Sequence, residues 1–286
     1  MAAPFKHFLV VSDFDQTLSF NDSGQILSDL LGITDFRQKV DGLALSNLVQ
    51  QGAELAYLIR HDPAFRGVRR EHLAEAGRLA SLRSDIPALV DFLQRGLDGF
   101  QFSFFVVSAA PQEVIQAALA GTVSSDHIIG TEFDYDPHSG EVQSIRRVPA
   151  GYGKVAVVER LEERLGTSPD RTIYVGDGSS DVHVMLHVNN RDGFTIAVSE
   201  NRMLARIAQS TVISDSAFSV LIPILERVVG WRSGEIRELF ESYALRLHEW
   251  EKARTDRVTI VGSSVIQPQI VTPTERGASQ AGDAVA

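Results

Sequence analysis

A short apolar run followed at once by two carboxylates constrains the fold of this chain most. Phe8 to Val11 is uninterrupted apolar sequence, and Asp13 and Asp15 follow it, with Thr17 close behind. Such a run is typical of a buried strand in a parallel sheet, where chemistry collects at the carboxyl ends of the strands. Two ionised carboxylates this close repel each other unless a cation lies between them. The segment therefore predicts an α/β fold and a site for a hard divalent ion such as magnesium.

The same pair could also do chemistry. One carboxylate could attack an electrophile as a nucleophile, and the other could move the proton. The plainer alternative is a strand followed by an acidic turn, and two acids in this spacing do not by themselves separate the alternatives. Three later segments of the chain favour a catalytic site.

The first two of these segments place a hydroxyl and an ammonium group at the ends of predicted elements. Ser108 follows the apolar run 102–107, beside backbone N–H groups that suit a phosphate, and Pro111 predicts the start of a helix. Lys154 opens a helical pattern, a position that the helix macrodipole disfavours for a cation. Near carboxylates and phosphate, however, its charge would neutralise theirs. We therefore interpret both residues as part of the site.

The third segment supplies two more carboxylates. The predicted strand 173–175 ends in the tight turn 176–178, which contains Asp177. Asp181 falls in the first turn of the following helix, where an acid is favoured. Because only a Gly-containing turn separates them, both side chains could face one ion. Helix capping alone would explain Asp181 but not Asp177.

In this order the segments resemble the four motifs of the haloacid dehalogenase superfamily, which consists mostly of phosphatases. The match covers residues 7–230. The resemblance implies that Asp13 is the nucleophile and Asp15 the acid/base, with Ser108 and Lys154 in the second and third motifs. An acid/base at position 15 favours a phosphatase or phosphomutase over a dehalogenase, because a dehalogenase has no leaving oxygen to protonate.

The resemblance also implies a magnesium ion as cofactor. The ion would be held by the side chain of Asp13, the backbone carbonyl of Asp15 and the side chain of Asp177, with Asp181 bound directly or through water. The implied phosphate ligands are Ser108, Ala109 and Lys154.

Within the superfamily the chain is most similar to the phosphoserine-phosphatase-like group. The implied fold is a doubly wound parallel sheet with a small helical cap inserted between the first and second motifs. A predicted hairpin over 132–148 fits that group. Two differences are visible: Ser180 stands where Asn is common, and Asn21 and Asp22 occupy the stretch where true phosphoserine phosphatases have a Glu.

The chain is predicted to consist of a catalytic core with one insertion. Helical patterning without a strong strand predicts the cap over 20–82, between core segments 1–19 and 83–230. Apolar residues at helical spacing predict a further helical extension over 231–262. The tail 263–286 is rich in Gln, Pro, Thr, Gly, Ser and Ala, which is typical of disorder.

Composition excludes several classes of partner. The net charge is −10, from 27 basic and 37 acidic residues, and no basic block stands out, so we expect no nucleic-acid partner. The absence of cysteine excludes disulfides and thiolate metal sites. No apolar run reaches the roughly 18 residues of a membrane span, and no cleavable signal is evident. We therefore expect a cytoplasmic protein without a membrane partner. The oligomeric state is not indicated.

Three functions compete at this stage. The favoured one is a phosphatase that hydrolyses a small phosphomonoester. A phosphotransferase or phosphomutase would use the same residues and differ only in whether the closed cap excludes water. A non-enzymatic phosphoacceptor or binding module is disfavoured by the complete catalytic set. The substrate itself is not indicated. The polar candidates in and beside the cap, all interpreted as surface residues, are Arg37, Asn47, Arg60, His61 and Arg83.

Overall fold

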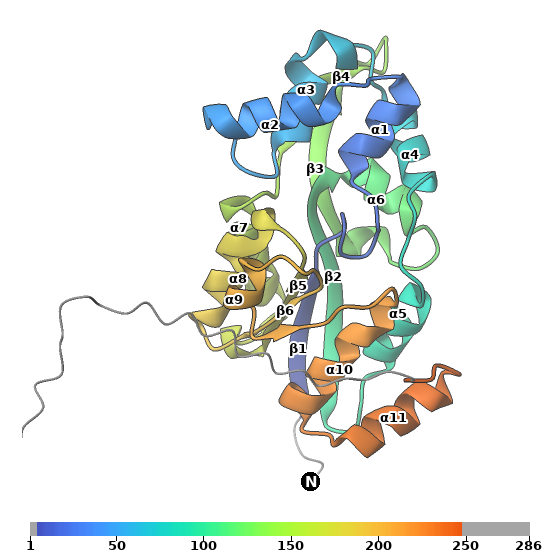
Figure 1. Ribbon diagram of the computed structural model, residues 1–286, viewed down its shortest axis with the longest axis vertical. Coiled ribbons are helices and arrows are strands. Elements are labelled where there is room, and N and C mark those ends of the chain that lie inside the picture. Colours follow the sequence, from blue (N-terminus) through green and yellow to red (C-terminus); the bar gives the residue numbers. More distant parts are fainter. Residues whose placement is uncertain (1–4, 248–286) are drawn as a thin grey trace, which may run out of the picture. The chain divides into compact units, whose positions relative to one another are not determined.

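The computed structural model describes residues 5–247, and its core is a seven-stranded sheet in the order β4-β3-β2-β1-β5-β6-β7 (Figure 1). The strands are β1 (Lys6–Ser12), β2 (Phe100–Pro111), β3 (Ile128–Tyr135), β4 (Val142–Arg147), β5 (Thr172–Gly176), β6 (Phe194–Ala197) and β7 (Ser210–Thr211). Every neighbouring pair is parallel except β3 and β4, which form an antiparallel hairpin. The α/β class and the mostly parallel sheet predicted from the sequence are thus confirmed.

The topology determines where a site can form. From β1 the chain order runs outward through β2 and β3 on one side and through β5 and β6 on the other. In doubly wound sheets, ligands bind outside the carboxyl ends of the strands at the point where the order reverses. That point lies at the end of β1, directly before Asp13.

Helices cover both faces of this sheet, and its central strands are therefore buried on both sides. On one face, Val11, Val107 and Tyr174 pack against Val158 and Met185. On the other face, α5 and α10 lie along the sheet (Figure 1). The core helices are α5 (Ile86–Arg95), α6 (Gln112–Ala118), α7 (Tyr152–Leu165), α8 (Val182–Asn189), α9 (Leu204–Ile207), α10 (Leu221–Pro223) and α11 (Ser233–Ser242).

The segment 20–82, between β1 and α5, is helical, as the sequence predicts. Its helices are α1 (Ser23–Leu31), α2 (Phe36–Ser46), α3 (Glu54–His61), the short 3₁₀ helix η1 (Pro63–Phe65) and α4 (Arg70–Arg78). Contacts tie this segment to the core: a Cβ at Gly77 of α4 would lie 2.2 Å from the carbonyl oxygen of Val114 in α6, and Val142 of β4 donates to the carbonyl of Val68. Of the described residues, 5–246 lie in one compact unit, so a separate cap domain stays a prediction.

The described part of the C-terminal extension packs on the core. Helix α11 buries Ile236 and Phe240, and the ring of Phe240 lies 4.9 Å from that of Phe218 in an edge-on contact. The predicted continuation to residue 262 and the tail 263–286 lie outside the described residues. Within residues 5–247, no helix has the length and apolar character needed to cross a bilayer.

Candidate active site

Asp13 occupies the first position beyond β1. Its backbone N–H donates to the carbonyl of Val175 at 2.9 Å, which continues the pairing of β1 with β5 by one residue. The side chain turns inward and is 4% exposed, with its Oδ1 accepting the N–H of Phe14 at 2.7 Å. Burial raises the pKa of Asp13 to about 6, against the lowering effect of the Lys154 charge. The Ser108 hydroxyl, by hydrogen bonding, also lowers it.

Lys154 lies fully buried between two carboxylates. Its Nζ donates to Asp13 Oδ2 and to Asp181 Oδ1, each at 2.6 Å, and its side chain is 0% exposed. Burial by itself would lower the pKa of this ammonium group, but the charges of Asp13 and Asp181 raise it above its usual value. Lys154 therefore carries a permanent positive charge next to the carboxylate that ends β1.

Asp181 has both carboxylate oxygens engaged. Oδ1 accepts from Lys154 and from the hydroxyl of Tyr174 at 2.7 Å, and Oδ2 accepts the backbone N–H groups of Asp177 and Gly178, each at 3.1 Å. Although burial raises its pKa, the Lys154 charge and these hydrogen bonds hold the pKa of Asp181 below its usual value. Because both of its oxygens already accept hydrogen bonds, the Asp181 carboxylate is better suited to holding Lys154 and the turn 176–178 than to binding an ion directly.

The turn that carries Asp177 requires glycine at its start. A Cβ at Gly176 would lie 2.5 Å from Asp181 Cγ, so only glycine admits the Asp181 carboxylate there. Asp177 itself is half-buried, and its Oδ1 accepts the hydroxyl of Thr17 at 2.9 Å. Burial, followed by the charges of Asp13 and Asp181, raises the pKa of Asp177 to about 7. The carboxylate is thus held in an environment that favours either a proton or a cation.

The carboxylates form a set that suits a hard divalent ion. One oxygen from each of Asp13, Asp177 and Asp181 lies within 4.8 Å of the others. Oxygen donors with this charge match the preference of magnesium. Burial raises the pKa of Asp13 and of Asp177, and neighbouring carboxylates add to this effect, so a bound cation would favour the ionised forms of both groups.

The side chain of Asp15 is hydrogen-bonded to the start of α1 and is not one of the three clustered carboxylates. Its Oδ1 accepts both the backbone N–H of Ser23 at 3.0 Å and the Ser23 hydroxyl at 2.5 Å. Burial, followed by the charge of Asp22, raises the pKa of Asp15 well above its usual value. The raised pKa favours the protonated form of Asp15 more than in a free carboxyl group. Nothing in the sequence indicates the contact with Ser23.

Ser108 and Ala109 lie beyond the end of β1. The last residue of β1, Ser12, pairs with Val106, while β2 continues to Pro111 with an irregular register against β3. Ser108 therefore lies within an extended strand rather than at the strand end predicted from the sequence. The extension carries Ser108, which is 2% exposed, next to Asp13.

A segment between α2 and α3 covers this site. A Cβ at Gly52 would lie 3.0 Å from the Cβ of Ser180, 3.3 Å from that of Ala150 and 3.6 Å from that of Ala109. The N–H of Gly52 donates to the buried Glu54 carboxylate at 2.7 Å. The sequence offers no signal for this contact, because it joins residues about 60 to 130 positions apart through the tertiary fold.

The raised pKa of Asp177 predicts a pH dependence for the stability of the metal-free protein. The folded state holds this proton up to about pH 7, whereas the ordinary pKa of an aspartate carboxyl is 3.8. The folded state thus binds more protons between these limits, and stability falls as pH rises through them. In EDTA, the melting temperature of Asp177→Asn should fall less than that of the wild type between about pH 5 and pH 8. Parallel profiles would contradict this assignment.

Comparison with known proteins decides the family. Residues 10–186 match the model of the haloacid dehalogenase-like hydrolases, a segment that runs from β1 into α8 and contains Asp13, Lys154 and Asp181. The chain belongs to this family. A search of curated protein sequences finds no significant match.

Solved structures share the fold of this hydrolase. A HAD family hydrolase from Salmonella enterica serovar Typhi is 14% identical, with a TM-score of 0.62 over 78% of this chain and 73% of the other. A substrate-bound phosphoserine phosphatase is 16% identical, with a TM-score of 0.58 over 77% and 98%. A phospho-aspartyl intermediate analogue of phosphoserine phosphatase is 17% identical, with a TM-score of 0.57 over 77% and 98%. At these identities the likeness establishes the fold.

Proposed function

We propose that this hydrolase is a magnesium-dependent phosphatase that hydrolyses a small phosphomonoester through an aspartyl-phosphate at Asp13. The observation that carries the proposal is the buried pairing of Asp13 with the positively charged Lys154. Asp15, whose pKa is raised by burial, is the proton donor that the proposal assigns. A nucleophile, a cation for the phosphoryl oxygens and a proton donor are the groups that hydrolysis of a phosphate ester requires. The solved phospho-aspartyl analogue of phosphoserine phosphatase has a similar fold.

In the first step an oxygen of Asp13 attacks phosphorus, and the bond to the ester oxygen breaks. Asp15 gives its proton to that oxygen, so the alcohol leaves neutral. In the second step Asp15, now ionised, removes a proton from water as the water attacks phosphorus. The bond between phosphorus and Asp13 breaks as the water oxygen bonds to phosphorus, so the Asp13 carboxylate is regenerated, inorganic phosphate is released and Asp15 is protonated again. The hydrogen bonds from Ser23 position Asp15 for both transfers.

The charge of the transferring phosphoryl group is balanced by fixed groups. Lys154 and the hydroxyl of Ser108 would bind its oxygens, together with the backbone N–H of Ala109. Catalysis of phosphoryl transfer is mostly positioning and charge stabilisation, so rigid burial of these groups favours it. The four hydrogen bonds to Asp181 supply that rigidity, because they fix the carboxylate that holds Lys154.

The residues that would hold magnesium are Asp13, Asp177 and the backbone carbonyl of Asp15. Asp181 would contact it through water, because its oxygens already accept hydrogen bonds. When bound, the ion neutralises phosphate charge and lets the Asp13 carboxylate approach phosphorus. Asp177 is held for this purpose by Thr17.

Phosphate release should therefore require magnesium. With a panel of small phosphomonoesters, we expect turnover to be abolished by EDTA and restored by excess Mg²⁺, and we expect Ca²⁺ to inhibit because its looser, larger coordination shell disturbs the attack geometry. Phosphate release is measured colorimetrically, with a metal-independent phosphatase as the assay control. Full activity in metal-free buffer would overturn the metal assignment.

The covered site favours a small substrate. Asp13 is 4% and Lys154 0% exposed beneath the segment that carries Gly52. A site closed in this way excludes bulk water and leaves little room for a folded phosphoprotein. We expect kcat/KM for the best small phosphomonoester to exceed that for phosphopeptides by at least about 100-fold, or about 2.7 kcal/mol. Equal or faster turnover of a phosphopeptide in parallel assays would exclude this substrate class.

A further inference from the structure

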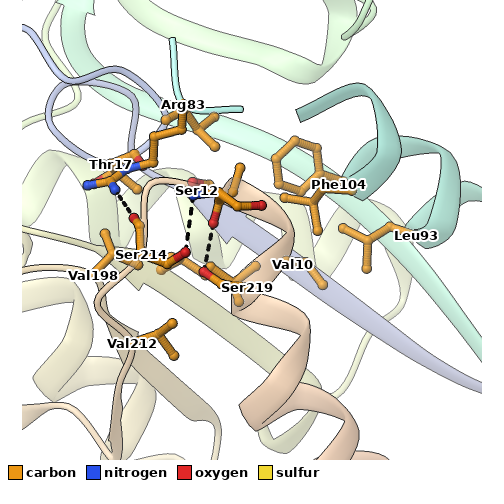
Figure 2. A pocket seen from close by; sticks show the side chains of 16 residues that line it. Val10, Ser12, Thr17, Arg83, Leu93, Phe104, Val198, Val212, Ser214 and Ser219 are labelled. Atoms are coloured by element: carbon orange, nitrogen blue, oxygen red, sulfur yellow. Dashed lines mark hydrogen bonds between the residues drawn. The ribbon is translucent and has the colours of Figure 1, made fainter. Parts of the chain in front are cut away.

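Arg83 lies where the chain returns from the inserted helices to the core, and its side chain joins three segments. Its Nε donates to the carbonyl of Thr17 at 2.8 Å, and one terminal nitrogen donates to the carbonyl of Gln16 at 3.1 Å. The other terminal nitrogen donates to the carbonyl of Ser214, in the segment after β7 (Figure 2). The guanidinium thus binds two consecutive carbonyls of the turn that follows Asp13 and Asp15 and anchors them to a separate loop.

Further contacts fix the guanidinium in this position. It lies 4.9 Å from the ring centre of Phe20, on the segment that leads out to the inserted helices, and the Arg83 backbone N–H donates to the carbonyl of Leu18 at 2.8 Å. A planar, delocalised cation can stack on a ring and fork onto several carbonyls at once, which lysine cannot do. Arg83 is partly exposed, as a surface residue is, but it makes specific contacts that its interpretation as a surface residue did not include.

The hydrogen bonds from Arg83 to the carbonyls of Gln16, Thr17 and Ser214, here called the clamp, lie between a filled interior and an open pocket. The cavity beneath it, lined by Val10, Ser12 and Leu93 among others (Figure 2), has a volume of about 10 Å³, room for one water at most. The pocket in front of it has a volume of about 480 Å³ and is lined by Arg83 and Asp177. The small cavity leaves little room for the turn to shift inward, and the hydrogen bonds from Arg83 oppose a shift outward.

Thr17 connects the clamp to the metal-binding carboxylates. While its carbonyl accepts from Arg83, its hydroxyl donates to Asp177 Oδ1 at 2.9 Å. Burial lowers the pKa of Arg83, and the charges of Asp215 and Asp177 act in the opposite direction, so both carboxylates lie within electrostatic reach of the guanidinium. Asp177 is the least buried of the three clustered acids and has no lysine contact of the kind that holds Asp13 and Asp181. Its orientation depends on Thr17.

We propose that Arg83 is a positioning residue for magnesium binding, which orients Asp177 by fixing the backbone of Thr17. The proposal rests on the proposed function only in taking Asp177 as a ligand of the ion. Without the clamp, the turn 16–17 can rotate and the Thr17 hydroxyl no longer holds Asp177 in one orientation. The ion must then order this carboxylate as it binds, which weakens binding.

Isothermal titration calorimetry with Mg²⁺ tests the proposal without any substrate. For Arg83→Ala we expect the Kd for Mg²⁺ to rise about tenfold, equivalent to about 1.4 kcal/mol. Arg83→Lys should recover part of this loss, because it keeps the charge but not the fork. In assays, the deficit in turnover should shrink as Mg²⁺ is raised. The matched control is Arg95→Ala, which removes a guanidinium that stacks on Tyr243 and pairs with Asp91; its Kd should equal that of the wild type.

A double-mutant cycle identifies the route of the effect. If Arg83 acts through Thr17, then Arg83→Ala combined with Thr17→Val should weaken Mg²⁺ binding no more than the stronger single variant does. Additive losses would overturn the proposed route. An unchanged Kd in Arg83→Ala or, if that variant does not fold, in Arg83→Lys would overturn the proposal itself. If the wild type bound no Mg²⁺, the proposed function would fail instead, so the two failures are distinguishable.

Discussion

Replacing Asp13 with asparagine should lower kcat by at least about 10⁴-fold, the order of loss that removal of a covalent nucleophile produces in other enzymes. The amide has nearly the same shape as the carboxylate but cannot attack phosphorus at a useful rate. The substitution also removes the ionic contact between Lys154 and Oδ2 of residue 13. The fold should persist, because Lys154 keeps its second partner, Asp181, and the N–H of Phe14 can still donate to the amide oxygen. Phosphate release and thermal denaturation, measured on the same preparation, check both parts.

The control for this variant is a matched aspartate outside the site. Asp134 lies on β3, where it accepts from Ser144 and Arg146, so Asp134→Asn should retain wild-type turnover. Mass spectrometry must show that the Asp13→Asn protein has not deamidated back to aspartate. Near-wild-type activity in an intact Asp13→Asn protein would show that another group is the nucleophile.

Replacing Lys154 with methionine should reduce both stability and turnover. Loss of the ammonium group leaves Asp13 and Asp181 buried without their cation, and breaking a buried ion pair costs about 3–5 kcal/mol. Turnover should fall by at least about 100-fold, because a fixed positive charge on the phosphoryl oxygens is lost. Mg²⁺ should restore part of the stability, since it supplies positive charge to the same carboxylates. Denaturant unfolding with and without Mg²⁺ measures the first effect.

A second lysine provides the comparison. Lys39 also lies between two aspartates, 2.9 Å from Asp62 and 3.5 Å from Asp35, but on the partly exposed surface of α2. Surface pairs of this kind contribute about 0–1 kcal/mol, so Lys39→Met should unfold almost as the wild type does and keep full turnover. Equal losses in the two variants would show that Lys154 has no special role.

The sequence contains enough information to place the main groups of the site. The segments before Asp13, Ser108 and Asp177 are apolar runs of strand length, and a buried parallel sheet brings the carboxyl ends of such strands together. The prediction of an α/β sheet is confirmed, and the structure brings Asp13, Lys154, Asp177 and Asp181 into contact distance. Their catalytic roles remain the proposal made above.

Contacts made through the tertiary fold could not be predicted. The apolar pattern around Tyr174 predicts a core residue of a strand, and nothing in the local sequence indicates that its hydroxyl donates a hydrogen bond to Asp181. Because arginine is mostly exposed in proteins, the sequence predicts that Arg83 lies on the surface. The three carbonyl groups that accept hydrogen bonds from it become evident only in the structure. Gly52 has no local pattern that places it over Ser180.

The helix boundaries in the structure differ from the predicted ones where long-range backbone pairing competes with helix formation. The charged pattern over 69–82 predicts a helix, but α4 ends at Arg78, because Ser81 and Leu82 pair with the outgoing segment at Phe20 and Ser19. Ser84, with Pro87 close behind it, predicts a helix cap, but its backbone pairs with the segment around Ser216, and α5 begins at Ile86. In both places long-range backbone hydrogen bonds move the helix boundary away from the predicted residue.

The central claim, a phosphoryl group carried by Asp13, is tested most directly with an aryl phosphate whose leaving group needs no proton. In Asp15→Asn the first step should persist while hydrolysis of the intermediate slows, because no base activates water. We predict a burst of phenolate equal to the enzyme concentration, and peptide mass mapping after acid quench should locate one phosphoryl group on Asp13. Phosphate release by the wild type, without a burst or phosphorylated Asp13 in Asp15→Asn, would contradict the account.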